Sequence, residues 1–374
     1  SMQCDFDGSP MPTDTMADED LLAMAEVLRE RDEGFIQITQ ATFEDQPSEE
    51  TAMRDLLFQE KLAEVSGRPV LHNAISAMDS MPEFHRMRLK WIEDCQRRGL
   101  RLFGQAAHAR FHIAITLDHW NMYDTSPAWN RATTGTQEEK KRKLGDPEVR
   151  AQMKAEEHRV ITYILGGPFQ GLRVQRTPDH PELARYHGKT VGEIAEAEGK
   201  HPLDAMLDIA LSGDLRVEFR TPEVFSTDAE KVAEMLRSPY VIPGVSDGGA
   251  HVKFFPTGTY TTDMLGWLVR DTEKLTLEEA HYHMSSLPAQ AAGFRERGTL
   301  REGAPADVVV YDLQNLRLTP EDEYEIAHDL PAGEWRRVQR AEGYRWIVVN
   351  GEVTFEDGRC TGATPGKLLR HGKG

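Results

Sequence analysis

The regular alternation of helical and strand patterns over residues 18–106 is the feature that most restricts the fold of this chain. Apolar residues recur at helical spacing and then in short runs, at 18–31, 35–39, 49–66, 69–76, 81–98 and 100–106. A glycine ends each helical pattern, because glycine adopts the left-handed conformation that closes a helix. This order is typical of parallel β/α architecture, so the predicted fold class is α/β.

An irregular stretch interrupts this order at 107–186. It is rich in aromatic and charged residues and includes the run EEKKRK at 138–143. Loops this long in a compact domain are usually functional, so we expect an insertion over the mouth of the parallel strands. The alternation then resumes, with helices expected at 190–198, 202–212, 227–238 and 275–293 and strands at 215–221 and 241–247.

The pattern changes again near residue 298. The stretches 298–313 and 344–362 alternate apolar and polar residues, and Asn-Gly and Asp-Gly pairs interrupt the second. Such pairs are the strongest short-range signal of antiparallel hairpins. We therefore predict two regions, an α/β domain over 1–297 and a small β-rich segment over 298–374.

Composition excludes some partners. The formal charge of −18 would repel nucleic acid and anionic membranes. The cysteines, Cys4, Cys95 and Cys360, include no C-x-x-C pair, which suits a reducing compartment. We find no run of about 18 apolar residues and no apolar stretch after Ser1-Met2, so neither a membrane span nor a signal peptide is expected. The expected location is the cytoplasm.

The segment VIPGVSDGGAHVKFF (241–255) contains the sharpest candidate site. Its apolar strand leads to Asp247, then Gly248-Gly249, with His251 four residues after the aspartate. The carboxyl end of a parallel strand is where barrel enzymes display catalytic groups, and a carboxylate there can bind a metal and accept a proton. Glycines let a substrate approach the backbone. We expect Asp247 to be catalytic and the two glycines and His251 to contact substrate; the alternative is that Asp247 only caps a turn.

Two further residues are candidates on neighbouring strands. His72 lies within PVLHNAIS (69–76), and a neutral imidazole at a strand end is a common metal ligand. The alternative is a hydrogen-bonded core histidine. Arg220 ends the expected strand at 215–221 on the same rim as Asp247, where its guanidinium could hold a substrate carboxylate. An ordinary surface ion pair is the alternative.

The other histidine groups are weaker candidates. His281 and His283 lie two apart in a helical pattern and so do not face each other, which argues against a metal pair. His108, His112 and His119 follow the third strand and could line the mouth of the site. We expect a solvated loop there instead.

Several segments read together resemble one enzyme family. These are GVSDGGAHV at 244–252, the phrase G-x-L-x-x-G-x-x-A-D-V-V-V-Y-D at 298–312 and V-N-G-E-V at 349–353. They are similar to the C-terminal third of the D-aminoacylase (N-acyl-D-amino-acid deacylase) branch of the amidohydrolase superfamily. The stretches 191–211 and 7–28 fit the same branch, so the resemblance covers essentially the whole chain.

The resemblance implies a partial TIM-like (β/α) barrel, comprising strands five to eight, with a C-terminal β-sandwich-type segment. It implies a zinc-dependent hydrolase that cleaves the amide of an N-acyl amino acid, with the D form expected. Asp247 matches the last strand's aspartate, which binds metal and acts as general base, and His72 matches the sixth strand's metal-ligand histidine. An arginine would hold the free carboxylate of the small-molecule substrate.

The chain departs from the family at the metal site. The first-strand His-x-His pair has no counterpart before residue 35, and FIQITQATF offers Thr39 and Gln40 where the fifth strand has a histidine. We therefore expect an incomplete site, an inactive isolated chain, and an N-terminal partner segment or self-association. The apolar strand at 35–39 should be covered by a second copy, another chain or the C-terminal β-segment.

Two alternative functions stay open from the sequence. A cyclic-amide hydrolase of the dihydroorotase or hydantoinase kind shares the fold and the last-strand aspartate. A non-catalytic, metal-free homologue would explain the missing fifth-strand histidine.

Overall fold

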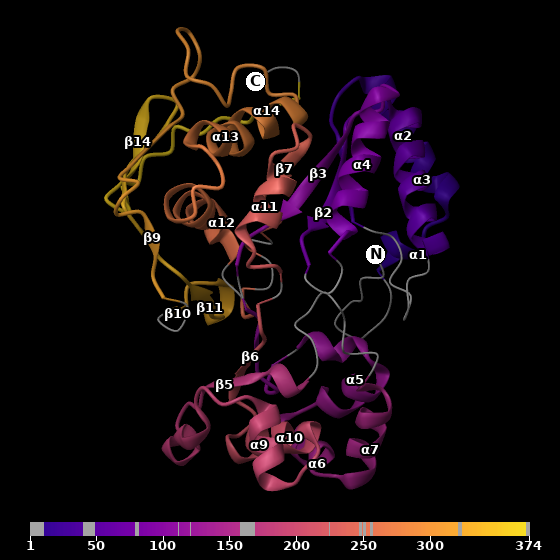
Figure 1. Ribbon diagram of the computed structural model, residues 1–374, viewed down its shortest axis with the longest axis vertical. Coiled ribbons are helices and arrows are strands. Elements are labelled where there is room, and N and C mark those ends of the chain that lie inside the picture. The colour runs from indigo at the N-terminus through magenta and orange to yellow at the C-terminus, as the bar shows by residue number, and fades with distance from the viewer. Residues whose placement is uncertain are drawn as a thin grey trace.

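The structure is a computed structural model, and it describes residues 11–39, 49–78, 82–110, 112–119, 121–157, 169–223, 225–246, 249, 252–254, 257–320 and 324–371. Figure 1 shows three regions of the chain. A parallel sheet with its helices forms one, a mostly helical lobe lies beyond the sheet, and a β-rich C-terminal segment lies on the other side of the sheet from the N-terminal helices.

The parallel sheet follows the order β1-β2-β3-β7. Its strands are β1 (Ile36–Thr39), β2 (Val70–Ser76), β3 (Leu102–Ala107) and β7 (Val241–Pro243). β1, β2 and β3 are adjacent both in space and along the chain, as the helix–strand alternation predicts, and the α/β class is confirmed.

Helices α1 (Pro12–Thr15), α2 (Asp18–Arg31), α3 (Glu49–Ser66), α4 (Phe84–Arg97) and α11 (Ala229–Leu236) accompany these strands. α3 and α4 are each followed by a glycine in the left-handed region, Gly67 at φ 62° and Gly99 at φ 83°. A side chain there would strain the backbone, so the sequence signal for the helix ends has a direct structural cause.

The two faces of the sheet have different neighbours. Val70 and Leu102 pack against α2, α3 and α4 in one apolar cluster, together with Leu62 and Cys95. Leu71 and Ile242 face the other way and pack with the helix α14 (Leu287–Ala291). This alternation follows from the two-residue period of a strand.

The lobe is larger than the insertion predicted at 107–186. It contains an antiparallel sheet in the order β4-β6-β5, formed by β4 (Ala114–Ile115), β6 (Glu218–Arg220) and β5 (Arg173–Arg176). Its helices are η1 (Met122–Thr125), α5 (Pro127–Thr133), α6 (Gln137–Leu144), α7 (Pro147–Ala155), η2 (Phe169–Gly171), η3 (Pro181–Tyr186), α9 (Val191–Glu198) and α10 (Pro202–Ser212).

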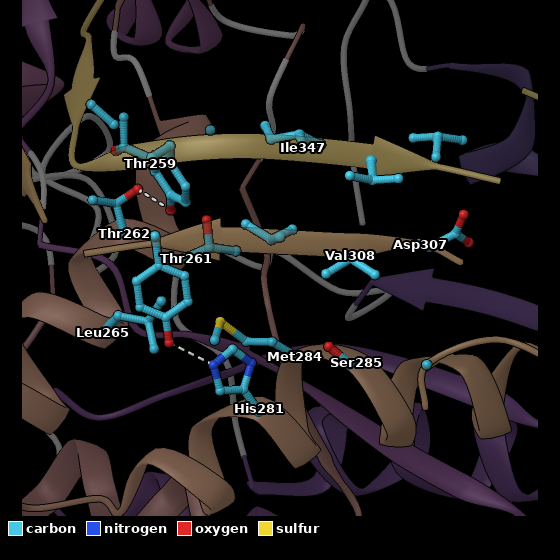
Figure 2. Close-up of a pocket in the computed structure, with 18 of the residues that line it drawn as sticks. Thr259, Thr261, Thr262, Leu265, His281, Met284, Ser285, Asp307, Val308 and Ile347 are labelled. Carbon is cyan, nitrogen blue, oxygen red and sulfur yellow. Dashed lines mark hydrogen bonds between the residues drawn. The ribbon is translucent and has the colours of Figure 1, made fainter. Parts of the chain in front are cut away.

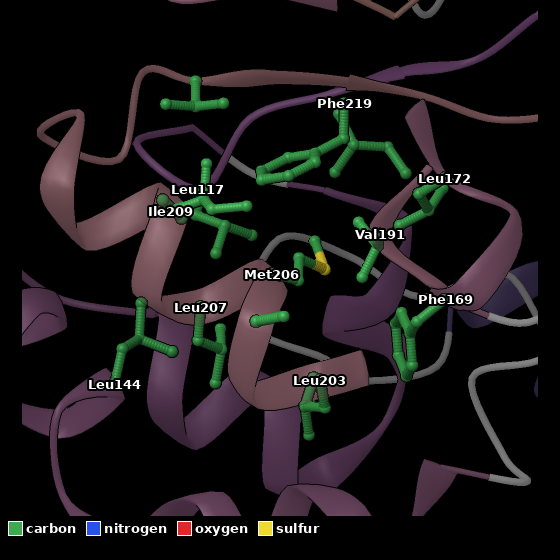
Figure 3. Close-up of a cluster of buried hydrophobic side chains, with 14 of the residues drawn as sticks. Leu117, Leu144, Phe169, Leu172, Val191, Leu203, Met206, Leu207, Ile209 and Phe219 are labelled. Atoms are coloured by element: carbon green, nitrogen blue, oxygen red, sulfur yellow. The ribbon is translucent and has the colours of Figure 1, made fainter. Parts of the chain in front are cut away.

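The lobe has its own hydrophobic core, shown in Figure 3. Met206 and Ile209 of α10 meet Phe219 of β6 and Phe169, and each of them is at most 4% exposed. The expectation that 190–198, 202–212 and 215–221 rejoin the parallel sheet is therefore wrong. Their apolar faces are buried against the lobe and not against the sheet.

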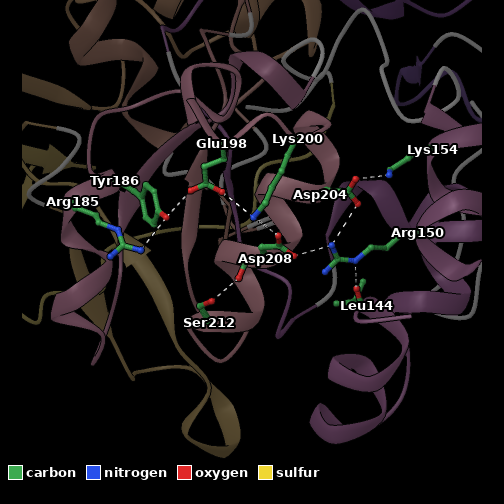
Figure 4. Close-up of polar contacts among 10 residues, drawn as sticks. All are labelled: Leu144, Arg150, Lys154, Arg185, Tyr186, Glu198, Lys200, Asp204, Asp208 and Ser212. Carbon is green, nitrogen blue, oxygen red and sulfur yellow. Dashed lines mark hydrogen bonds and ion pairs between the residues drawn. The ribbon is translucent and has the colours of Figure 1, made fainter. Parts of the chain in front are cut away.

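Ion pairs join the outer helices of the lobe, as Figure 4 shows. Arg150 of α7 contacts Asp208 at 2.8 Å and Asp204 at 3.4 Å, both on α10. Lys200 bridges Asp208 and Glu198 at 2.8 and 3.0 Å. Such half-exposed pairs are individually weak, so the core and not this network carries the stability of the lobe.

After β7 the chain forms a run of short helices. They are η4 (Thr257–Thr259), α12 (Tyr260–Asp263), the π-helix η5 (Met264–Asp271), α13 (Leu277–His281), the π-helix η6 (Tyr282–Ser286) and α14. Pro288 lies in the first turn of α14, and because proline lacks an N–H it cannot continue the hydrogen bonding of the preceding turn. The expected helix at 275–293 is thus present but changes its winding before Pro288.

The C-terminal segment is antiparallel. Its strands are β8 (Val308–Tyr311), β9 (Arg317–Leu318), β10 (Glu325–Ala327), β11 (Arg336–Val338), β12 (Ala341–Glu342), β13 (Tyr344–Val349), β14 (Glu352–Glu356) and β15 (Arg359–Cys360), with a short helix η8 (Pro331–Gly333). The turns at Asn350-Gly351 and Asp357-Gly358 have positive φ at both residues. The hairpins predicted from these pairs are confirmed.

The outer edge of the parallel sheet is not covered by the C-terminal segment. Within the described part of the chain, β1 pairs with β2 alone, and the sheet of β15, β14, β13 and β8 is separate. Of the three covers expected for residues 35–39, the C-terminal segment does not serve in the described part of the chain, because its hairpins pair with one another; a second copy or another chain stays a prediction. Among the described residues, we find no helix both long and apolar enough to cross a membrane.

Candidate functional site

The carboxyl ends of β3 and β7 lie side by side and lead into the lobe (Figure 1). The backbone of Gly244, just after β7, donates a hydrogen bond of 3.1 Å to the carbonyl of Ala106 in β3. Gly244 has φ 115°, and a Cβ there would lie 2.9 Å from the ring of Tyr260. Only glycine fits this close approach, so the chain can leave β7 beside the end of β3.

His108 lies directly after β3 at this rim. It is 2% exposed and packs edge-to-face on Tyr260, with 5.7 Å between ring centres. Burial lowers the pKa of His108, against the opposing effects of the Ala106 carbonyl and of Asp263. The imidazole is therefore neutral at pH 7.

Arg110 and Asp263 form an ion pair beside His108. Nη2 of Arg110 lies 2.6 Å from Oδ1 of Asp263, and the backbone N–H of Arg110 donates to Oδ2 at 3.2 Å. The guanidinium stacks over Trp267 at 4.5 Å. Asp263 is 6% exposed, so this pair fixes the segment after β3 onto α12.

His112 and Glu223 lie where the rim meets the lobe. Nδ1 of His112 is 2.9 Å from the Thr221 carbonyl, so Nδ1 carries the proton and Nε2 has the lone pair. Nε2 lies 3.9 Å from Oε1 of Glu223. Burial, followed by the charge of Arg220, lowers the pKa of His112 to about 4. Burial raises the pKa of Glu223, opposed by Arg110 and Arg220.

These contacts change the interpretation of the histidines after the third strand. His108 and His112 are anchored at the rim, so the expected solvated loop is wrong for both. His119 is 40% exposed at its side chain and packs on Trp335 at 5.6 Å. The rim position of His108 could have been found from its place directly after an apolar strand.

His72 does not reach this rim. It is fully buried on the side of the sheet that α3 and α4 cover, with Nδ1 3.0 Å from Oε1 of Gln59 and its ring 5.3 Å from Trp91. Burial, followed by the charge of Arg88, lowers its pKa to about 3. The strand alternation turns this side chain toward the helices that cover the sheet. Because Asp247 lies outside the described residues, the shared metal site of His72 and Asp247 stays a prediction.

The opposite face of the sheet has polar side chains that the sequence reasoning missed. Nε2 of Gln37 donates to Oε1 of Gln105 at 2.8 Å, across β2. Nδ2 of Asn73 donates to Oγ1 of Thr39 at 3.4 Å. Gln37 and Thr39 are two residues apart in β1, and this spacing was the available signal, because residues two apart share a face of the sheet.

Arg220 lies in β6, so it belongs to the lobe's antiparallel sheet. It pairs in register with Ala114 of β4 and with Arg173 of β5. The expectation that it ends a strand of the parallel sheet is wrong. It nevertheless remains near the rim, since its charge acts on both His112 and Glu223.

Asp247, Gly248 and His251 lie outside the described residues. The strand that precedes them ends at Pro243, earlier than the predicted 247, and its carboxyl end is at the rim beside His108. Gly249 is described; it has φ 95° and borders a large cavity. The roles of these four residues stay predictions.

The cavity has a volume of about 1380 Å³ and lies between the helices after β7 and the sheet of the C-terminal segment (Figure 2). Two hydrogen bonds join side chains that line it, one between His281 Nε2 and the Tyr311 hydroxyl at 2.6 Å and one between the Thr262 and Tyr344 hydroxyls at 2.8 Å. His283 instead contacts the Val241 carbonyl at 3.0 Å. The two histidines have different neighbours, as predicted for residues two apart in a helix.

The residues placed by the structure do not fit a zinc centre. Within the described ranges, no three His, Cys, Asp or Glu side chains come together in a way that could hold a metal ion. A catalytic zinc needs about three protein ligands. The described part of this chain therefore supplies a rim of neutral histidines and paired charges but no metal site.

An α/β protein with its functional groups at the carboxyl ends of parallel strands is the class that this fold and rim define. A family model described as "Amidohydrolase family" matches residues 107–355. This chain belongs to the amidohydrolase family.

Several relatives within and around this family are similar to the chain. It is 33% identical to an N-acyl-D-glutamate deacylase of Alcaligenes xylosoxydans xylosoxydans over 204 residues, 53% of this chain and 36% of the relative. It is 30% identical to an N-acyl-D-aspartate deacylase of the same organism, over 47% of this chain and 34% of the relative. An uncharacterised protein of Mycobacterium tuberculosis is 30% identical over 47% of this chain and 29% of the relative.

The chain is also similar in fold to a solved structure. The crystal structure of a D-aminoacylase superimposes with a TM-score of 0.53 at 20% identity, covering 93% of this chain and 58% of that chain. The chain matches only about a third of the length of each curated relative named above.

Proposed function

We propose that this chain is the C-terminal part of a hydrolase that removes the acyl group from N-acyl-D-amino acids. The observation that carries the proposal is the family match over 107–355, which includes the residues after β7, the first of which, Gly244, bonds to the carbonyl of Ala106 in β3. The similarity to deacylases of acidic N-acyl-D-amino acids supports this substrate class. In this proposal the four parallel strands are half of a (β/α) barrel, and an N-terminal segment or a second copy completes it.

Asp247 is the proposed acid–base group. Its carboxylate would accept a proton from the attacking water and pass it to the leaving amine. A divalent metal, zinc in this proposal, would activate that water when bound. Because the described residues do not fit a zinc centre, we propose that Asp247 shares the metal with ligands from outside this chain.

Arg220 is the proposed partner of the substrate carboxylate, with Gly248, Gly249 and His251 alongside. A guanidinium can hold a carboxylate by two parallel hydrogen bonds. Its influence on the pKa of both His112 and Glu223 supports a position near the rim. The low pKa of His112 keeps that imidazole neutral, so it adds no competing positive charge.

A metal-free homologue is the second candidate. The observation that favours it is at the end of β1, where the sequence has Thr39 in place of the histidine that the family resemblance implies. Metal content separates the two, because a deacylase would purify with zinc and a metal-free homologue would not.

The test uses the longest natural form of the protein that contains this chain. It should hydrolyse N-acetyl-D-glutamate or N-acetyl-D-aspartate, and Asp247→Asn should lower kcat by about a thousandfold. Asp271→Asn is the matched control, because Asp271 is exposed and paired with Arg270. The 374-residue chain alone should show negligible turnover, even with added zinc. Equal activity of both variants, or hydrolysis of neither substrate by a zinc-loaded protein, would contradict the proposal.

A further inference from the structure

The segment that follows β7 is held on one side by the lobe. The backbone N–H of Ala114 in β4 donates a hydrogen bond of 2.9 Å to the carbonyl of Phe254. The ring of Phe254 packs against the lobe's hydrophobic core. The residues just before Phe254 in the sequence include Asp247 and His251, so the lobe anchors the end of the segment that contains them.

A hairpin of the C-terminal segment holds the same residues from the other side. The backbone N–H of Arg337 in β11 donates to the Val252 carbonyl at 2.9 Å, and Nε of Arg337 donates to the Lys253 carbonyl at 2.7 Å. The ammonium of Lys253 lies 5.2 Å from the centre of the Trp335 ring and pairs with Glu334. Three residues of β11 and of the turn before it therefore contact Val252 and Lys253.

Arg337 also reaches the lobe. Its Nη2 lies 2.6 Å from Oε2 of Glu218 in β6, and the two side chains are only 3% and 7% exposed. The hydroxyl of Tyr324 contacts the same carboxylate at 2.6 and 2.7 Å. The guanidinium of Arg337 lies over the Tyr324 ring at 4.5 Å, and that of Arg176 in β5 at 4.9 Å. One buried side chain thus connects the hairpin, the lobe and the segment after β7.

The directions of the hydrogen bonds that Arg337 donates, and not its charge alone, distinguish it from a lysine at this position. A guanidinium is planar, and here its Nε donor is used on a carbonyl while Nη2 is used on a carboxylate. A lysine could neutralise Glu218, but all its donors are on one nitrogen, so it lacks the two separate, coplanar nitrogens with which arginine reaches both acceptors. Arg337 therefore fixes the position of the Lys253 carbonyl relative to β6, beyond balancing the charge of Glu218.

We propose that Arg337 is a positioning residue that holds Val252 and Lys253 between the lobe and the C-terminal hairpin. Asp247 precedes Val252 by five residues in the sequence, so this anchor would limit where the proposed acid–base residue can lie. The catalytic consequence depends on the proposed function, whereas the anchoring can be measured without any activity.

The experiment is hydrogen exchange on the full 374-residue chain, read by mass spectrometry. Arg337→Met and Arg337→Lys should both raise exchange in peptides covering 244–254 and at Ala114 by about tenfold, because each loses a charge-assisted hydrogen bond to the Lys253 carbonyl. Arg336→Met is the matched control, since Arg336 is the neighbouring residue of β11 and pairs with the exposed Asp329. Its exchange in these peptides should equal that of the wild type.

A second variant separates positioning from stability. Arg337→Met leaves Glu218 buried without its ion-pair partner, with the Tyr324 hydroxyl still donating to it, and this loss destabilises the lobe by itself. The double variant Glu218→Gln/Arg337→Met removes that charge, so the lobe-core amides of 205–211 should stay protected while 244–254 still exchanges fast. Wild-type exchange of 244–254 in the double variant would overturn the proposal.

Kinetics of the longer protein then give an independent readout. Arg337→Lys should lower kcat/KM about tenfold or more, because Asp247 and the proposed substrate contacts Gly248, Gly249 and His251 all precede the anchored residues in one stretch of the chain. If the longer protein has no hydrolase activity, the proposed function fails while the exchange result still decides the anchoring. If Arg337→Lys leaves both exchange and kcat/KM unchanged, the positioning role is wrong.

Discussion

His72 is fully buried, with the ring of Trp91 from α4 edge-on to it and Gln59 of α3 as its hydrogen-bond partner. A buried imidazole resists protonation because the charged form loses its hydration. His72 is therefore a neutral core residue in the folded chain, and its protonation is coupled to unfolding.

This burial predicts how stability depends on pH. The pKa of His72 is about 3 in the folded chain and near 6.5 in the unfolded chain, so between these values the unfolded state binds more protons. Stability is fully present above pH 6.5 and is lost as the pH falls, with a slope of up to about 1.4 kcal/mol per pH unit. Urea unfolding of the wild type and His72→Gln from pH 4 to 7 should show this extra slope in the wild type alone.

His180 provides a control of opposite sign. Hydrogen bonds to Glu182 and Asp214 raise the pKa of His180. Its contribution is therefore present at low pH and is lost as the pH rises through the folded pKa. His180→Gln should destabilise the chain more at pH 5 than at pH 8, and equal pH dependence of both variants would contradict the assignment for His72.

Gly244 illustrates a constraint at the scale of a single backbone position. It combines φ 115° with a Tyr260 ring 2.9 Å from where a Cβ would lie. Gly244→Ala should lower the free energy of unfolding by about 1–3 kcal/mol, because backbone strain and overpacking both act. Gly258→Ala is the control, since a Cβ at that position would meet no heavy atom within 4 Å and no positive φ is required. Thermal denaturation compares the two, and equal melting temperatures would contradict the argument.

At the scale of elements, the lobe is a unit with a separate core. Phe219 of β6 is fully buried there, against Met206 and Ile209 of α10. Phe219→Ala should lower the stability of the lobe by about 3–5 kcal/mol. Phe355→Ala, at a position in β14 that is 39% exposed, should change stability by no more than about 0.5 kcal/mol.

The measurement for this pair is urea unfolding with site-resolved hydrogen exchange. Phe219→Ala should increase exchange in α9 and α10 first, while β2 and β3 keep the protection of the wild type. Simultaneous loss of protection in the lobe and the parallel sheet would show that the two unfold together.

At the scale of the whole molecule, β1 is an edge strand that, among the described residues, pairs on one side only, with β2. The Ile36 N–H donates to the Pro69 carbonyl on the β2 side at 2.9 Å. In a parallel strand, the backbone N–H groups of successive residues point alternately to one edge of the strand and to the other. The N–H groups of Gln37 and Thr39 therefore point away from β2, to the open edge. Phe35 beside them is 38% exposed, so this edge is apolar as well as unpaired.

We expect the exchange of the Gln37 and Thr39 amides to depend on assembly. In dilute, monomeric chain they should exchange fast while Ile36 and Ile38 are protected. In a self-associated chain, or with the N-terminal part present, all four should be protected. Sedimentation and hydrogen exchange over a hundredfold range of concentration test this, and fast exchange of Gln37 in an associated form would show that the edge is not the interface.

The sequence by itself determined the local features of this protein. Gly67 and Gly99 end their helices, and Asn350-Gly351 and Asp357-Gly358 form their turns, because positive φ is a property of the residue and its immediate neighbours. The parallel strands β1, β2 and β3 were also predictable from local sequence, because short apolar runs that alternate with helices are typical of a parallel sheet.

Only the tertiary structure decided which face and which region each element joins. His72 turned out to face α3 and α4, and Arg220 lies in the lobe's sheet, because both depend on which apolar surface lies opposite after folding. The contact of Arg337 with Glu218 joins residues more than a hundred positions apart. No local pattern predicts such a pair, since its stability comes from burial that exists only once the lobe and the hairpin have met.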